Sequence, residues 1–180
     1  MNRFSSYITL QTVRLDVSAA SRKRLFEEAS ALFEVAYGIS HSEVFDALIA
    51  RERLGSTCVG AGCALPHGRL PELEEPALVF LRTAEPVSLD SPDGRGVRLC
   101  FCLLVPENDE KDYLGVLREI ACLLSQKPMR QALLDAADDV AVCELLHAWE
   151  PPADLHASAE AADALSENED VNDETPRTDD

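Results

Sequence analysis

One short stretch, residues 51–69, gathers most of the side chains in this sequence that could do chemistry. It reads RERLGSTCVGAGCALPHGR and holds one histidine, His67, between Pro66 and Gly68. A nucleophilic histidine must be neutral, exposed and held in one orientation. Pro66 has a fixed φ and restricts Leu65 to extended conformations, so the chain leading to His67 is stiff. The pattern therefore predicts a reactive imidazole at residue 67.

The residues around His67 suit a phosphoryl group, because phosphoryl oxygens need N–H donors, hydroxyls and a nearby cation. The stretch supplies these groups as arginines, hydroxyls and glycine amides at Arg51, Arg53, Arg69, Ser56, Thr57, Gly55, Gly60 and Gly62. Gly68 has no side chain that would obstruct a docking partner. Ser56 and Thr57 could instead satisfy carbonyls at the end of the preceding helix.

The order RERLGST (residues 51–57), then PHGR (residues 66–69), resembles the enzyme IIA domains of the fructose/mannitol class of the bacterial phosphotransferase system. The nitrogen-regulatory members of that family are the most similar type. The similarity runs in register from about Val13 to Trp149. The resemblance implies that His67 is the phosphoacceptor and that Arg51 is the active-site arginine. It also implies roles in holding phosphate or a partner for Ser56, Thr57, Gly60, Gly62, Gly68, Arg69 and Tyr113.

Tyr113 marks a departure from the family pattern. Many members have a second histidine just before a leucine, early in the helix after the central strand, and this chain has Tyr113 before Leu114. A tyrosine hydroxyl can donate to a phosphoryl oxygen but carries no charge at neutral pH. The replacement of histidine by Tyr113 therefore affects the expected rate of transfer and the expected lifetime of a phosphohistidine. An equal alternative is that Tyr113 is a partly buried packing residue.

A metal site is the main alternative to phosphoryl chemistry at His67. Cys58, Cys63 and His67, with Cys100 and Cys102 on one face of a strand, could supply soft ligands for zinc. Their spacing contains no paired CxxC, and Cys100 and Cys102 belong to the most apolar segment of the chain. We therefore predict no metal and no other cofactor.

Composition narrows the class of protein. No apolar run reaches the roughly 18 residues of a membrane span, and the N-terminus lacks the pattern of a signal peptide. The six cysteines fall in apolar segments, as expected for free thiols in a reducing cytosol, so we predict a cytoplasmic protein. The formal net charge of −17 is unsuited to nucleic acid and favours a basic protein partner.

Hydrophobic periodicity predicts an α/β domain over residues 1–150. The run 97–105 is almost continuously apolar, as in a strand covered on both faces, which requires helices on both sides of the sheet. The expected fold is a three-layer α/β/α domain with a small mixed β-sheet, the type that the family resemblance also implies. The predicted strands are 13–17, 77–82 and 97–105, and the predicted helices are 21–37, 42–53, 113–125, 128–136 and 140–149.

Several local details are also predicted. Residues 1–12 read as a loose start, Ser18 as the cap of the first helix, and Ser40 with Glu43 as a capping box for the second. Leu54 is expected on the buried face of that second helix. Residues 151–180 contain ten acidic residues and one arginine, so we expect a disordered acidic tail.

Together these features predict a phosphoryl-carrier regulatory protein rather than a stand-alone turnover enzyme. The family resemblance implies an HPr-like phosphocarrier as donor, and regulated targets such as potassium-transport or sensor proteins. Three alternatives stay open: a sugar-specific IIA that passes phosphate to a permease IIB, an interaction module that is never phosphorylated, and a metal-binding sensor. The oligomeric state is also open, with a homodimer as one option.

Overall fold

The computed structural model describes residues 1–108 and 112–155 of the 180-residue chain. The predicted tail therefore lies almost wholly outside the described residues. The elements follow in the order η1 (Ser5–Tyr7), β1 (Val13–Val17), α1 (Arg22–Tyr37), α2 (His41–Glu52), β2 (Cys58–Gly60), β3 (Cys63–Ala64), β4 (His67–Leu70), β5 (Ala77–Val87), β6 (Val97–Pro106), α3 (Asp112–Ser125), α4 (Lys127–Asp135) and α5 (Asp139–Ala148).

The strands form one mixed sheet in the order β1-β5-β6-β3-β2, and β4 also pairs with β6. β1 is parallel to β5, β5 is antiparallel to β6, and both β3 and β4 are parallel to β6. The register places His67 beside Leu103 and Gly68 beside Leu104. The chain around the histidine is therefore fixed along the central strand β6.

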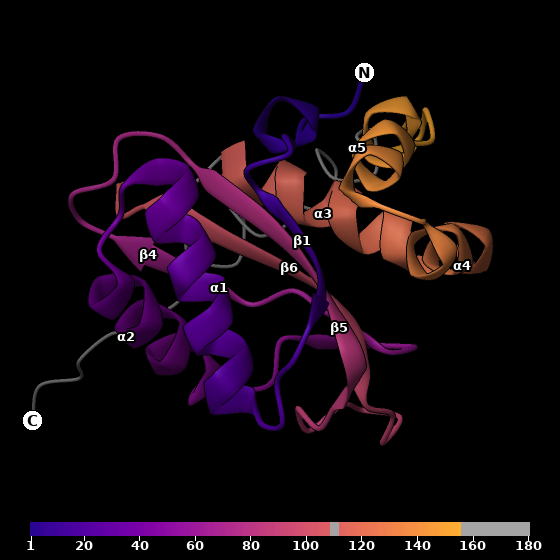
Figure 1. Cartoon of the computed structure of the whole chain (residues 1–180). Helices are drawn as coiled ribbons and strands as arrows, with labels where there is room; N and C mark the ends of the chain where they lie inside the picture. Colours follow the sequence, from indigo (N-terminus) through magenta and orange to yellow (C-terminus); the bar gives the residue numbers. More distant parts are fainter. Residues whose placement is uncertain (109–111, 156–180) are drawn as a thin grey trace, which may run out of the picture.

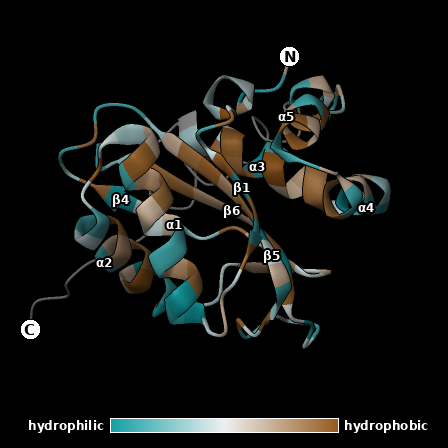
Figure 2. Ribbon diagram, viewed as in Figure 1, coloured by the Kyte–Doolittle hydropathy of each residue, from teal (hydrophilic) through white to brown (hydrophobic). Residues whose placement is uncertain are grey.

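Helices cover both faces of the sheet, as predicted (Figure 1). The helices α1 and α2 lie on one face, and α3, α4 and α5 lie on the other. Side chains of β6 alternate between two apolar cores: Phe101 and Leu103 face the α3–α5 side, and Cys102 and Leu104 face the α1–α2 side. Figure 2 shows the hydrophobic colouring of β5 and β6 between the helical layers. The prediction of a three-layer α/β/α domain is confirmed.

The N-terminal segment is not loose, contrary to the expectation from its mixed composition. Asn2, Phe4 and Ile8 are buried. The Asn2 side-chain amide donates to the carbonyls of Leu146 and Trp149, at 2.9 and 2.8 Å, and the Phe4 ring stacks on Trp149. The first residues are thus held by the last helix, a pairing that no local pattern in the sequence reveals.

Four other local expectations were wrong. The hydroxyl of Ser21, not Ser18, caps α1 by accepting from the backbone N–H of Arg24. The Ser40 hydroxyl makes no cap hydrogen bond and lies beside the Ser42 hydroxyl instead. Leu54 is 84% exposed, because α2 ends two residues before it. The remaining difference is that β5 continues through Pro86 to Val87 rather than ending before that proline.

Candidate functional site

His67 begins strand β4 and lies at a surface pocket of about 390 Å³. The pocket is formed by α2, β4, the end of β6 and the start of α3. Its walls are contributed by Ala47, Ala50, Arg51, Leu54, His67, Gly68, Arg69, Val105 and Tyr113. Five of the residues singled out from the sequence therefore meet at one place: Arg51, His67, Gly68, Arg69 and Tyr113.

A hydrogen-bond contact at each ring nitrogen orients the imidazole of His67. Nδ1 lies 2.9 Å from the carbonyl oxygen of Leu65. Because a carbonyl can only accept, this contact places the ring proton on Nδ1. Nε2 therefore has a free lone pair, and it accepts a 3.3 Å hydrogen bond from Nε–H of Arg51. The geometry selects the tautomer in which Nε2 is the nucleophile.

Burial of the imidazole lowers the pKa of His67 below its usual value. The hydrogen bond to Leu65 opposes this shift. The guanidinium of Arg51 lowers the pKa further, the Glu52 carboxylate raises it, and Arg69 lowers it by a smaller amount. The balance favours the neutral ring at neutral pH, which is the form that a nucleophile requires.

Arg51 lies in the last turn of α2, so its position depends on how that helix packs. Its Nη1 donates to the Gly55 carbonyl at 3.0 Å, which fixes the guanidinium beside Nε2 of His67. Gly68 lets α2 approach β4 closely, since a Cβ on Gly68 would lie 3.2 Å from backbone atoms of Ala47. Gly68 is therefore buried against α2, which gives it a packing role besides leaving space for a partner.

Arg69 and Tyr113 form the opposite wall of the pocket. Nη2 of Arg69 donates to the Tyr113 hydroxyl at 3.0 Å, and the guanidinium carbon lies 5.2 Å from the centre of the ring. Nη1 of Arg69 donates to the carbonyl of Glu107 at 3.0 Å. Tyr113 thus orients a second cation at the pocket, and its role in holding phosphate or a partner stays a prediction.

The two hydroxyls predicted to hold phosphate have other partners in this structure. The Ser56 hydroxyl donates to the Leu89 carbonyl at 3.2 Å and accepts from the backbone N–H of Cys58. The Thr57 hydroxyl donates to the Glu52 carboxylate at 2.7 Å and is buried. Neither residue lines the pocket, and their direct role in phosphate binding stays a prediction.

Gly60 and Gly62 shape the turn between β2 and β3 rather than the pocket. Both have positive φ, at 85° and 77°, which favours glycine. The Asp93 carboxylate braces this turn by accepting from the backbone N–H of Ala61 at 2.8 Å. That hydrogen bond, with one from the N–H of Arg95, holds the pKa of Asp93 at about 2. The phosphate-binding role proposed for these glycines also stays a prediction.

All six cysteines are free thiols. Cys100 and Cys102 lie on one face of β6, as predicted, with their sulfur atoms 3.6 Å apart. Contact with Cys102 and burial raise the pKa of Cys100, and burial raises the pKa of Cys63 to about 11. Metal ligation requires thiolates. In the part of the chain that the structure describes, no group of histidine, cysteine and carboxylate side chains has the geometry of a metal site.

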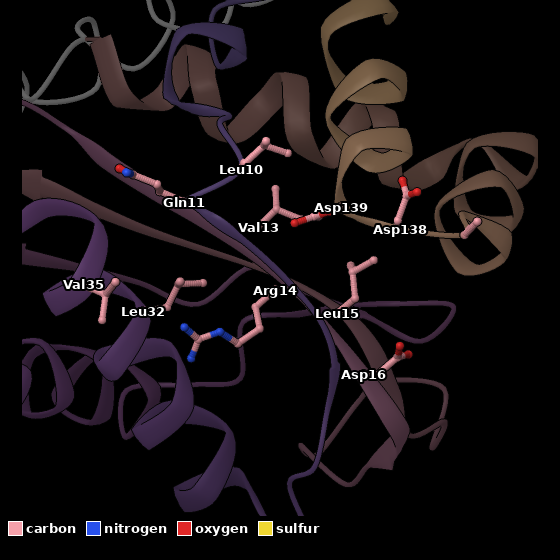
Figure 3. Close-up of a pocket in the computed structure, with 11 residues that line it drawn as sticks. Leu10, Gln11, Val13, Arg14, Leu15, Asp16, Leu32, Val35, Asp138 and Asp139 are labelled. Atoms are coloured by element: carbon pink, nitrogen blue, oxygen red, sulfur yellow. The ribbon is translucent and has the colours of Figure 1, made fainter.

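A second hollow of about 540 Å³ lies along β1, between α1 and the start of α5 (Figure 3). We call it the β1 groove. Arg14 extends from β1 on the side of α1, and Asp138 and Asp139 lie on the side of α5. The Asp138 carboxylate already caps α5 by accepting from the backbone N–H of Ala141 at 2.8 Å. This groove contains no histidine, cysteine or serine.

The sequence profile described as "Phosphoenolpyruvate-dependent sugar phosphotransferase system, EIIA 2" matches residues 6–149. The fold and the histidine–arginine pocket thus define a IIA domain of the phosphotransferase system. The chain belongs to this EIIA type 2 family, which confirms the family predicted from the RERLGST and PHGR motifs.

Nitrogen regulatory proteins are among the similar proteins. One from Bradyrhizobium diazoefficiens is 38% identical over 126 residues, covering 70% of this chain and 82% of that protein. The crystal structure of nitrogen regulatory protein IIA-Ntr from Neisseria meningitidis is 43% identical, with a TM-score of 0.76, covering 79% of this chain and 98% of that one. A complex of mannitol enzyme IIA with phosphorylated enzyme IIB from Escherichia coli, 21% identical with a TM-score of 0.63, covers 76% and 94% and shares the fold.

Within residues 1–108 and 112–155, every helix is too short or too polar to cross a membrane.

Proposed function

We propose that this protein is a phosphoryl carrier of the nitrogen branch of the phosphotransferase system. It accepts a phosphoryl group on Nε2 of His67 from an HPr-like phosphocarrier and regulates partner proteins according to its phosphorylation state. The observation that carries the proposal is the fixed His67 tautomer: Nδ1 faces the Leu65 carbonyl and Nε2 faces the pocket beside Arg51. Membership of the EIIA family and similarity to nitrogen regulatory proteins support it.

The chemistry is an in-line transfer between two imidazoles. The Nε2 lone pair of His67 forms the new N–P bond, while the N–P bond of the donor breaks and returns its electron pair to the donor ring. The proton on Nδ1 stays in place, so the phosphorylated ring of His67 carries a positive charge that the Leu65 carbonyl stabilises. Arg51 exchanges its contact with Nε2 for a phosphoryl oxygen. No metal or nucleotide enters these steps.

The regulatory part of the proposal follows from charge. A phosphoryl group adds about −1.5 to −2 charges at the pocket where Arg69 and Tyr113 meet. A partner that docks over this pocket then experiences a changed surface potential. Potassium-transport and sensor proteins are the targets that the family resemblance offers. We place the protein in the cytoplasm, in keeping with its six free cysteines.

A sugar-specific IIA is the second candidate. The shared fold of the mannitol IIA, which is solved as a complex with phosphorylated IIB, keeps it open. In that case phosphate would leave His67 for a IIB domain of a fructose- or mannitol-type permease. A non-phosphorylated interaction module is the third candidate, with Tyr113 at the position of the family's second histidine as its basis.

The test is phosphotransfer in vitro. Phosphoenolpyruvate, enzyme I and the HPr-like carrier of the nitrogen branch are mixed with the wild type, His67→Ala and, as matched control, His41→Ala. Intact mass is read before and after acid treatment. We expect an acid-labile phosphate on the wild type and on His41→Ala, and none on His67→Ala.

Two results would contradict the proposal. Absence of phosphate on the wild type, while another IIA in the same mixture is phosphorylated, would favour the interaction module. Rapid transfer of the phosphate to a sugar IIB would favour the sugar-specific IIA.

A further inference from the structure

Glu52, the last residue of α2, is a buried carboxylate directly behind the site. Its exposed fraction is 5%. A buried carboxylate is costly unless hydrogen bonds replace its water. Glu52 accepts two such bonds from one residue: the Thr57 hydroxyl donates at 2.7 Å and the Thr57 backbone N–H at 3.3 Å. Glu52 therefore fixes the position of Thr57.

Thr57 in turn connects to the histidine through the backbone. Its carbonyl oxygen accepts from the N–H of Leu65 at 3.0 Å. The carbonyl of Leu65 then faces Nδ1 of His67 at 2.9 Å. Glu52, Thr57, Leu65 and His67 thus form a continuous chain of hydrogen bonds, and its last link is the contact that selects the tautomer.

We propose that Glu52 is a positioning residue for phosphoryl transfer at His67, acting through Thr57 and Leu65. Its effect on the transfer rate rests on the proposed function, whereas its effect on the tautomer of His67 can be measured without any phosphate donor. The Glu52–Thr57 pair keeps the Leu65 carbonyl in place, so that the ring proton stays on Nδ1 and the Nε2 lone pair faces the pocket.

The negative charge of Glu52 also favours phosphorylation of His67. The phosphorylated imidazole carries a positive charge, because Nε2 has formed a bond to phosphorus and Nδ1 has kept its proton. Among the described residues, the main charged groups that act on this ring are Arg51, Glu52 and Arg69, and Glu52 is the negative one. A nearby carboxylate therefore stabilises the ring as its charge develops.

Three variants test the chain of hydrogen bonds. Glu52→Gln removes the charge and offers an N–H where Thr57 needs an acceptor. Thr57→Val removes the hydroxyl, and Thr57→Ser keeps it. The matched control is Glu119→Gln, which alters a buried glutamate that accepts from the N–H of Arg3 and lies on the other face of the sheet.

The readouts are the ¹⁵N NMR shifts of the His67 ring as a function of pH and the rate of phosphotransfer. For Glu52→Gln we expect a mixture of tautomers, a His67 pKa lower than in the wild type because a negative charge is lost, and transfer slower by about tenfold. Thr57→Val should also mix the tautomers and slow transfer, and Thr57→Ser, which keeps the hydroxyl, should restore the single tautomer. Glu119→Gln should match the wild type in both readouts.

The proposal is overturned if folded Glu52→Gln keeps the wild-type tautomer and pKa of His67. Should Glu52→Gln fail to fold, the Thr57→Val and Thr57→Ser pair decides, and equal spectra for both would overturn it. If the wild type accepts no phosphate, the proposed function fails, but the ring shifts still decide whether Glu52 positions His67.

Discussion

The His67 pocket and the β1 groove are both surface hollows, and the larger one is the less suited to chemistry. The groove measures about 540 Å³ against about 390 Å³ for the pocket. Its carboxylates already have partners: Asp138 caps α5, and Asp16 lies 3.4 Å from the Arg82 guanidinium. In the pocket, the lone pair on Nε2 of His67 accepts a 3.3 Å hydrogen bond from the N–H of Arg51. The reactivity proposed for His67 therefore rests on a fixed tautomer next to cations and not on the size of the hollow.

Each hollow contains an arginine, so one matched pair of substitutions tests this contrast. We expect Arg51→Gln to slow phosphotransfer by about a hundredfold, the usual effect of removing one donor that stabilises charge in the transition state. Arg14→Gln removes the same charge from the β1 groove and should leave the rate unchanged. Single-turnover transfer from the phosphorylated HPr-like carrier measures both.

Equal rates for Arg51→Gln and Arg14→Gln would contradict the assignment of Arg51. If both variants transferred phosphate more slowly than the wild type by the same factor, the arginines would act through the overall charge of the acidic protein, for instance in attracting the carrier. Raising the salt concentration separates these cases, because screening weakens long-range attraction more than a direct contact.

The His67 pocket also depends on close packing between α2 and β4. Gly68→Ala would place a Cβ 3.2 Å from backbone atoms of Ala47. Because backbone atoms in the middle of α2 cannot shift alone, we expect a loss of about 1–2 kcal/mol in the free energy of unfolding. Urea denaturation measures this change.

Gly115→Ala is the control for that prediction. The atoms nearest to its Cβ would be those of the Arg3 side chain, which is half exposed and can shift, and alanine is the better helix former within α3. We expect Gly115→Ala to be neutral or slightly stabilising. If Gly68→Ala were as stable as Gly115→Ala, the close approach of α2 to β4 would not constrain the pocket.

The sequence predicted the main elements well because their signals are local. The apolar run 97–105 indicated a strand covered on both faces, and β6 is that strand. The motifs at residues 51–57 and 66–69 indicated the site, and Arg51, His67 and Arg69 do line one pocket. Hydrophobic periodicity and the two motifs thus placed the main elements and the histidine pocket correctly, whereas the finer local expectations at Ser18, Ser40 and Leu54 were wrong.

The sequence could not reveal contacts that depend on the folded chain. His67 begins β4, a four-residue strand that pairs with β6 and that was not among the predicted strands. Glu52 is buried, although a glutamate at the end of a helix is usually exposed. The hydrogen bond from Arg69 to Tyr113 joins residues 44 positions apart. None of these has a periodic or compositional signal.

The pH dependence sharpens the contrast between Arg51 and Arg14. Because burial and Arg51 lower the pKa of His67, the unfolded chain binds more protons than the folded one just below pH 6.5. The contribution of His67 to stability is therefore present above about pH 6.5 and is lost as pH falls toward the folded-state pKa. NMR titration should show Arg51→Gln raising the pKa of His67, with Arg14→Gln leaving it as in the wild type.

An unchanged His67 pKa in Arg51→Gln would mean that the guanidinium does not act on the ring in solution. The His67 signal is assigned by its absence from the spectrum of His67→Ala.

The smallest effect on the rate of phosphotransfer is expected for Tyr113, on the wall of the pocket that it forms with Arg69. Tyr113→Phe removes the hydroxyl that accepts from Nη2 of Arg69 but keeps the ring beneath the guanidinium. Arg69 also keeps its bond to the Glu107 carbonyl, so it should move little. Loss of one exposed hydrogen bond is worth about 0.5–1.5 kcal/mol at most, and we expect transfer to slow by about threefold.

Tyr113→His restores the side chain typical of the family. If Tyr113→His prolongs the lifetime of the acid-labile phosphate while Tyr113→Phe does not, the residue acts on the phosphorylated state through a polar group. If neither variant differs from the wild type, Tyr113 serves only to pack against Arg69.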